Sequence, residues 1–254
     1  MTEGYREFEF DLPGALLTHL VKLLDGMEAA PLNTGGLDVV PEAQGIYQLF
    51  LDGELVYIGK TDAESGLLKR LTRHSWKIQH RQNLTPERVS FKAVRIFVFT
   101  AMDLETQLIK AYRGEAGTAW NGSGFGANDP GRKRDHSTPG KFDLQFPIDI
   151  DRHLDIDFTG DLSAAQVALR LKEVLPYDFR FQSRSSGGRK PHEDLEETRV
   201  TIPPEANTAR AVVEKLVGQL PAGWQATALS ALLILYKERE DGYPTAIVLA
   251  RSPV

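Results

Sequence analysis

Two short apolar runs flank the dipeptide Asp52-Gly53, and this pattern constrains the fold more than any other feature of the chain. The first run is GIYQLFL, at 45–51, and the second is ELVYIGK, at 54–60. Both contain the β-branched and aromatic residues that favour strands, and Asp-Gly is a common two-residue hairpin turn. We therefore predict an antiparallel β-hairpin over these residues.

Helix and strand patterns alternate around this hairpin. Apolar residues recur at helical spacing in 15–27, 65–80 and 104–113, and the run at 91–100 is typical of a buried strand. Two residues could cap the last of these helices, Thr100 and Asp103. This order of elements predicts an α+β fold, in which helices flank a small, mainly antiparallel sheet.

A second pattern occurs twice after residue 150. SAAQVALRL begins at Ser163, TARAVVEKL begins at Thr208, and each apolar stripe is followed by a Leu-Pro pair. A hydroxyl N-cap before the stripe and a proline after it predict two helices. A duplicated βαβ unit and a similarity that arose by chance both remain open.

Strands are expected beside these two helices. The candidates are Leu154–Phe158, Arg199–Ile202 and a final hairpin from 226–237 to 245–250. The change of character near residue 150 predicts a C-terminal α+β domain of its own. The expected parts are, in chain order, an N-terminal helical extension at 1–40, a first domain at 41–145 and a second domain at 150–254.

The formal net charge of −5 argues against a protein that coats nucleic acid without specificity, but the average hides an asymmetry. Residues 1–59 contain two basic and ten acidic side chains, whereas 60–95 contain nine basic and three acidic ones. A second basic run follows at Arg132-Lys133-Arg134. Such patches can contact phosphates, although a charged run is often only a solvated helix face.

Composition excludes several other classes. The absence of cysteine rules out disulfides, a thiol nucleophile and thiolate-bound metal sites. No run approaches the ~20 apolar residues of a membrane span, and the first residues are too acidic for a secretory signal. We therefore expect a cytoplasmic protein with no membrane partner.

Six chemically capable side chains follow one another in a recognisable order. They are Tyr47 in Gly-Ile-Tyr, Tyr57 in Tyr-Ile-Gly, Arg70, His74, Glu105 and Asn121. Arg70 and His74 are four residues apart in the helix predicted at 65–80, so they share one face. Taken together, these residues resemble the GIY-YIG nucleases, and the resemblance covers residues 40–135.

Within that family the chain is most similar to the type II restriction endonucleases, which have the arginine–histidine pair and a glycine-rich stretch like GFGANDPG at 124–131. The resemblance implies that 41–145 is a nuclease domain that cuts double-stranded DNA at specific sites, with CCGCGG as the first target to test. It further implies one Mg²⁺ or Mn²⁺ per active site, a homodimer and a cognate DNA methyltransferase as genetic partner.

One spacing departs from the family pattern. Glu105 and Asn121 are 16 residues apart, more than in much of the family, and Glu115 in the intervening stretch is a rival for the acidic role. Glu105 fits better because Leu108 and Tyr112 place it in the expected helical phase.

Phosphodiester hydrolysis needs a proton acceptor, positive charge and a means of binding metal. Tyr47 would accept the proton of the attacking water with help from His74, or His74 would accept it directly. Both remain open because a free tyrosine, with a pKa of ~10, is a poor base. Arg70 would contact the non-bridging oxygens, and the carboxylate of Glu105 suits Mg²⁺.

Other residues would position the substrate. Tyr57 and Lys60 would orient the water and hold the phosphate, and Asn121 would brace the site. A further set of polar and basic side chains is expected to contact the bases and phosphates: Gln79, Gln82, Arg132, Lys133 and Arg134.

Simpler explanations exist for each residue alone. Tyr47 and Tyr57 could be ordinary core aromatics of a hairpin, and Glu105 could favour only the helix dipole. Two functional alternatives also remain: a GIY-YIG nuclease of DNA repair or of a mobile element, and an inert DNA-binding module with the same fold.

Overall fold

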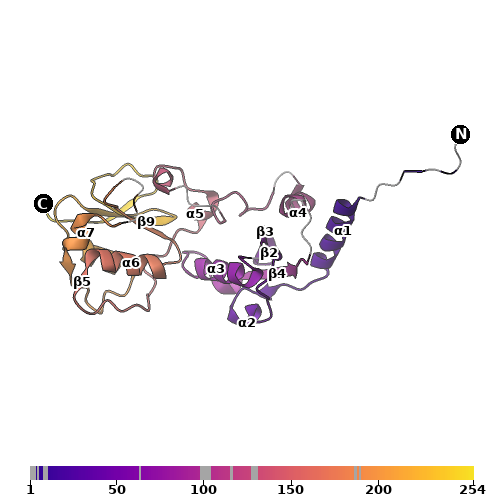
Figure 1. Cartoon of the computed structure of the whole chain (residues 1–254), viewed down its shortest axis with the longest axis horizontal. Coiled ribbons are helices and arrows are strands. Elements are labelled where there is room, and N and C mark those ends of the chain that lie inside the picture. The colour runs from indigo at the N-terminus through magenta and orange to yellow at the C-terminus, as the bar shows by residue number, and fades with distance from the viewer. Residues whose placement is uncertain are drawn as a thin grey trace. The chain divides into compact units, whose positions relative to one another are not determined.

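The computed structural model describes residues 4, 6–7, 11–62, 64–97, 104–114, 117–126, 131–185, 188 and 190–254 (Figure 1). The chain forms two compact units. Unit 1 comprises Met1–Ser75 and Pro86–Asn121, and unit 2 comprises Trp76–Thr85 and Gly122–Val254. Helices combine with mainly antiparallel sheets, so the fold class is α+β, as predicted.

Unit 1 is built on a four-stranded antiparallel sheet in the order β1-β4-β2-β3. The strands are β1 (Ala30–Pro31), β2 (Gly45–Leu51), β3 (Glu54–Thr61) and β4 (Val89–Arg95). β2 and β3 form the predicted hairpin. Its turn residues Asp52 and Gly53 have φ values of 51° and 86°, the left-handed conformation that a type I′ turn requires.

Helices cover both faces of this sheet (Figure 1). They are α1 (Leu12–Asp25), α2 (Thr34–Leu37), α3 (Leu67–Gln79) and α4 (Leu104–Arg113), with a 3₁₀ turn at Pro86–Arg88. Leu24 of α1 and Leu108 of α4 pack with Ile46 and Ile58 on one face. α3 covers the opposite face, where Tyr47 lies. The expected caps Thr100 and Asp103 lie outside the described residues.

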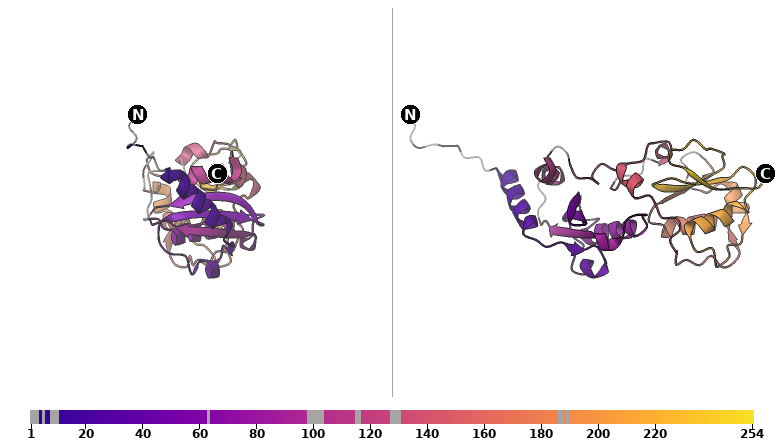
Figure 2. Two further views of the ribbon diagram at one scale, coloured as in Figure 1. Left: turned by 90° about the vertical axis from the view of Figure 1, so that its right-hand side faces the viewer. Right: turned by 180° about the vertical axis from the view of Figure 1, so that it is seen from behind.

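Unit 2 contains a four-stranded sheet in the order β10-β8-β9-β6 and a small pair, β5-β7. Its strands are β5 (Leu162–Ser163), β6 (Asp178–Phe181), β7 (Arg199–Val200), β8 (Gln225–Ala228), β9 (Leu232–Tyr236) and β10 (Ile247–Arg251). Its helices are the 3₁₀ turn Gly131–Arg134, α5 (Lys141–Gln145), α6 (Ala164–Val174), α7 (Glu193–Glu197) and α8 (Ala209–Val217). Figure 2 shows α6 and α8, in orange, along one face of the sheet.

Both predicted helices of the C-terminal half are present with their caps. The hydroxyl of Ser163 accepts from the amide of Gln166, and the hydroxyl of Thr208 accepts from the amide of Ala211. The segments β5-α6-β6 and β7-α8-β8 therefore follow the same order. However, β6 pairs in parallel with β9, whereas β8 pairs antiparallel with β9.

Two strand predictions for this half are wrong. Residues 154–158 form no strand, because Asp157 turns the chain by accepting from the amide and hydroxyl of Thr159, and the strand begins at Leu162. Residues 226–237 are not one hairpin arm. They form β8 and β9, which turn at 229–231 and pair with each other, and β10 pairs with β8.

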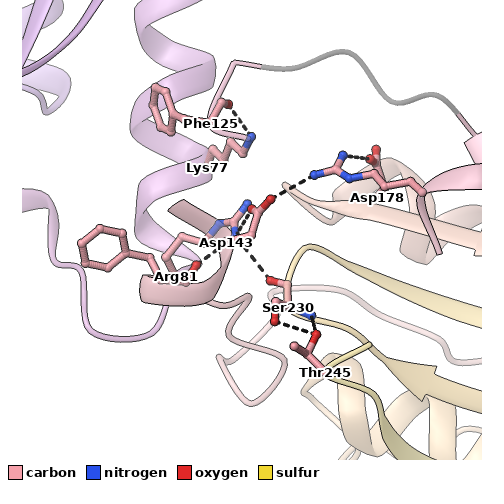
Figure 3. Close-up of polar contacts among 9 residues, drawn as sticks. Lys77, Arg81, Phe125, Asp143, Asp178, Ser230 and Thr245 are labelled. Atoms are coloured by element: carbon pink, nitrogen blue, oxygen red, sulfur yellow. Dashed lines mark hydrogen bonds and ion pairs between the residues drawn. The ribbon is translucent and has the colours of Figure 1, made fainter. Parts of the chain in front are cut away.

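The two units do not begin and end at the expected domain boundaries near residues 40 and 145–150. Residues 122–150 fold within unit 2, because Arg81 forms a buried ion pair with Asp143 at 2.9 Å and donates to the carbonyls of Phe146 and Ser230 (Figure 3). The Asp143 carboxylate also binds Arg134 at 3.1 Å. At the other end, α1 packs into the core of unit 1.

None of the described helices is long and apolar enough to cross a membrane. The longest of them, α1, has 14 residues, whereas a span needs about 20.

Candidate active site

The two tyrosines of the hairpin lie on the same face of the unit 1 sheet. Tyr47 is opposite Gly59 in the register between β2 and β3, and Tyr57 is opposite Leu49. A Cβ atom at position 59 would lie 2.5 Å from Cζ of Tyr47 and 2.8 Å from Cε1 of Tyr57. Gly59 therefore leaves the space that both rings occupy, which gives the glycine of the Tyr-Ile-Gly motif a steric role.

Tyr47 connects the sheet to α3. Its hydroxyl lies 2.8 Å from Nε2 of His74, and Nε of Arg70 donates to the same oxygen at 3.4 Å. The Tyr47 side chain is fully buried, and His74 is only 4% exposed. Because Arg70 donates to the phenol oxygen, the proton of Tyr47 is available to an unprotonated Nε2 of His74.

Three rings surround this hydrogen bond. The centroids of Tyr47 and Tyr57 are 5.9 Å apart, and His74 lies 5.5 Å from Tyr47 and 5.7 Å from Tyr57. These separations are those of packed aromatic pairs, which prefer tilted or edge-to-face arrangements. The interplanar angles of 35°, 45° and 63° agree with that preference. The rings thus hold one another in place.

Burial dominates the electrostatics of the tyrosines. It raises the pKa of Tyr47, because a phenolate loses hydration inside the protein. The negative charge that Tyr57 has when ionised adds to the increase. The hydrogen bond and positive charge of Arg70 oppose this shift. For Arg70 itself, burial lowers the pKa, but its contacts with Tyr47 and Tyr57 outweigh burial and raise it. Tyr47 is therefore a protonated, hydrogen-bonded phenol at neutral pH.

Glu105 lies within electrostatic reach of the same cluster. Burial is the largest cause of a raised pKa at Tyr57, and the carboxylate of Glu105 is the second. Glu105 is half-buried in the first turn of α4. The structure thus brings four of the six predicted side chains into contact, Tyr47, Tyr57, Arg70 and His74, while Glu105 acts on Tyr57 through its charge.

Asn121 braces the edge strand of the sheet. Its Oδ1 accepts from the amide of Ile58 at 2.9 Å, and its Nδ2 donates to the carbonyl of Ile58 at 2.8 Å. The backbone amide of Trp120 donates to the carbonyl of Val56 at 2.8 Å. The segment therefore pairs with β3 between Val56 and Ile58, directly beside Tyr57. Asn121 therefore braces the strand that contains Tyr57.

One partner of this brace was not expected from the sequence. The hydroxyl of Thr118 donates to Oδ1 of Asn121 and so fixes the orientation of its amide. A threonine three residues before an asparagine in a loop is a common local pattern, so the sequence carries only a weak signal for it. The rival acid Glu115 lies outside the described residues.

The predicted DNA-contacting residues fall in both units. Lys60 is exposed on β3 of unit 1, next to Gly59. Gln79 and Gln82 belong to unit 2, where Nε2 of Gln82 donates to the carbonyl of Ile148 at 3.3 Å. The basic run also lies in unit 2: Arg132 pairs with Glu238 at 2.5 Å, Arg134 pairs with Asp143 and Asp178, and the side chain of Lys133 is outside the described part.

The donor set at the cluster suits one hard divalent cation. The charge of the Glu105 carboxylate acts on Tyr57, whereas the side-chain amide of Asn121 is already hydrogen-bonded to Ile58. A cation bound through this one carboxylate of the described residues would keep most of its water ligands, which is typical of Mg²⁺. A second group of ligand atoms occurs in unit 2, at His192, Glu193 and Asp194. There, however, Asp194 already binds Lys237 and Trp224.

Comparison of the sequence with protein-family models and with curated proteins found no match. The relation to the GIY-YIG nucleases is therefore a proposal. It depends on the six residues, on their order in the sequence and on the geometry described above.

Proposed function

We propose that the chain is a GIY-YIG endonuclease that cleaves double-stranded DNA at specific sites, as a type II restriction enzyme in the cytoplasm. The observation that carries the proposal is the hydrogen-bonded cluster of Tyr47, Arg70 and His74 on the face of the hairpin. An ordinary hydrophobic core would not bury a histidine and two tyrosines beside a half-buried arginine. Burying polar groups costs free energy unless they are hydrogen-bonded, and proteins tolerate such a cost mainly at functional sites.

The geometry supports a proton relay. The raised pKa of Tyr47 disfavours a standing phenolate, so Tyr47 alone is a weak base. When its oxygen takes the proton of an attacking water, its own proton can pass over the 2.8 Å hydrogen bond to Nε2 of His74. Arg70, which donates to the same oxygen, stabilises the negative charge that develops there during the transfer.

The remaining residues position and neutralise the phosphate. Arg70 stays protonated at physiological pH, and a guanidinium can bind two phosphoryl oxygens at once. Lys60 adds positive charge next to Gly59, and Tyr57 orients the water. Glu105 would bind the divalent cation, Mg²⁺ or Mn²⁺. When bound, such a cation supplies positive charge that stabilises the leaving oxygen.

Site-specific cleavage implies partners for this chain. A palindromic target favours a twofold-symmetric homodimer, in which each subunit cuts one strand. A DNA methyltransferase encoded nearby would protect the host. Both are part of the proposal.

Incubation of a supercoiled plasmid with the purified chain and Mg²⁺ tests this function. One plasmid carries CCGCGG, and a matched plasmid lacks it. The proposal predicts discrete fragments, abolished by Arg70→Ala and by Glu105→Gln. Arg73→Ala, which removes an exposed arginine from the same helix, should retain cleavage at saturating DNA. Cleavage of branched DNA alone would favour a repair nuclease, and no cleavage with any divalent cation would favour an inert DNA-binding module.

A further inference from the structure

Unit 2 contains a cavity of about 680 Å³ at the edge of its sheet. Arg180 and Phe181 of the edge strand β6, Lys172 of α6 and Tyr236 of β9 line it, together with Arg132. The cavity lining includes three cationic side chains and, among the described residues, no carboxylate. The residues that line this cavity belong to unit 2, whereas Tyr47, Arg70 and His74 belong to unit 1.

Two of the three cationic side chains form ion pairs with carboxylates that do not line the cavity. Arg180 pairs with Asp135, which is fully buried. Arg132 pairs with Glu238 at 2.5 Å, and its guanidinium lies 4.1 Å from the ring centroid of Tyr236. These partners hold the arginines in fixed positions at the cavity wall.

Lys172 differs from both arginines. Its ammonium lies 5.7 Å from the ring centroid of Phe181, and it has no carboxylate partner among the described residues. It is exposed and occupies the last turn of α6. The charge of Lys172 is thus without a carboxylate partner among the described residues, whereas ion pairs orient the two arginines of the cavity.

We propose that this cavity binds a backbone phosphate of the DNA, away from the scissile phosphodiester. The inference rests on the proposed function and gives unit 2 a role in gripping the duplex. A phosphate fits because its oxygens can accept from several fixed donors at once, while Lys172 supplies the unbalanced charge. Base stacking fits less well, because Arg132 covers Tyr236 and Lys172 lies over Phe181.

The chain offers a matched pair of lysines for the test. Lys172 lies in the last turn of α6, and Lys215 lies in the last turn of α8; both are exposed, and only Lys172 lines the cavity. The affinity of the full chain for a fluorescent duplex carrying CCGCGG is measured in EDTA at several salt concentrations. Lys172→Glu should weaken binding roughly tenfold more than Lys215→Glu, and Lys172→Arg should retain the affinity of the wild type.

The salt dependence identifies a phosphate contact. Removing one such contact lowers the slope of log affinity against log salt by about 0.9. We expect this decrease for Lys172→Glu and not for Lys215→Glu. Equal effects of the two variants, or no measurable DNA binding by the wild type, overturn the inference. Cleavage is assayed separately with Mg²⁺, so a wild type that binds through Lys172 but never cuts overturns the nuclease proposal alone.

Discussion

Tyr47 illustrates how single residues shape the candidate site. It is fully buried, and its hydroxyl lies between a donor nitrogen of Arg70 and Nε2 of His74. Its ring occupies space that only a glycine at position 59 leaves open. The chemistry proposed for the cluster therefore depends on a steric detail of the neighbouring strand as much as on the polar residues themselves.

Gly59→Ala should damage both stability and the site. The added methyl group would overlap the rings of Tyr47 and Tyr57, and overpacking of this kind costs about 1–3 kcal/mol. Chemical denaturation should show this loss, together with reduced DNA cleavage. Gly4→Ala is the control, because nothing lies within 4 Å of the added atom there. Unchanged stability of Gly59→Ala would contradict the packing of the two tyrosine rings against Gly59.

The lowered pKa of Lys77 predicts that the stability of the protein depends on pH. Burial lowers its pKa to about 7, and the nearby charge of Arg81 adds to the decrease. In the unfolded chain the pKa is near 10.4. The unfolded state therefore binds more protons than the folded state between these values, so the free energy of unfolding should rise with pH from about 7 to 10.

Denaturation of Lys77→Met over that pH range measures the effect. Methionine has no proton to bind, so this part of the slope should disappear. Lys69→Met, at an exposed position on the same helix, should keep the slope of the wild type. A slope that is identical in all three proteins would contradict the burial of the Lys77 ammonium.

At the scale of elements, the site depends on how the edge strand β3 is held. β3 pairs with β2 on one side, and the side chain of Asn121 completes the pairing of Ile58 on the other. Because Ile58 lies between Tyr57 and Gly59, a shift of this strand would move both residues of the motif.

Asn121→Ala should loosen this edge. It leaves the amide and the carbonyl of Ile58 without their partners, which costs about 1–3 kcal/mol for a partly buried group. Hydrogen exchange of the Ile58 amide should quicken in the variant. Thr118→Val, which removes only the hydroxyl that orients the Asn121 side chain, should have a smaller effect in the same direction. An unchanged exchange rate in Asn121→Ala would contradict the bracing role.

Local sequence patterns predicted those helices and strands whose conformation depends mainly on residues close together in the sequence. The hairpin followed from Asp52-Gly53, and the helix at 104–113 agrees with α4 residue by residue. The turn between β8 and β9 was missed, because Leu229 and Ala231 continue an apolar run without glycine or proline. The convergence of the six side chains was expected only through the family resemblance, since α3, α4 and the hairpin meet by long-range packing.

At the scale of the whole molecule, the chain forms two units, and a buried ion cluster organises the second. Asp143 is 1% exposed and binds both Arg81 and Arg134 (Figure 3). No sequence pattern indicates that residues 62 positions apart form this pair. The cluster explains why residues 76–85 fold with unit 2 although they follow Arg70 and His74 of α3.

Asp143→Asn should therefore destabilise unit 2 strongly. Removing one partner of a buried ion pair leaves an uncompensated charge on Arg81, at a cost of about 3–5 kcal/mol. The fluorescence of Trp224, which is buried in unit 2, should report the loss during denaturation. Asp241→Asn breaks an exposed pair with Arg251 and should cost less than about 1 kcal/mol. Equal costs for the two variants would contradict the burial of the cluster.

The most direct test of the central claim is a double-mutant cycle on cleavage. Single-turnover rates with Mg²⁺ are compared for the wild type, Tyr47→Phe, His74→Gln and the double variant. If Tyr47 and His74 form one relay, each single variant should lose about 10²–10⁴ in rate, and the double variant should be no slower than the slower single variant. Losses that multiply in the double variant, or single variants that cleave at the rate of the wild type, would contradict the account.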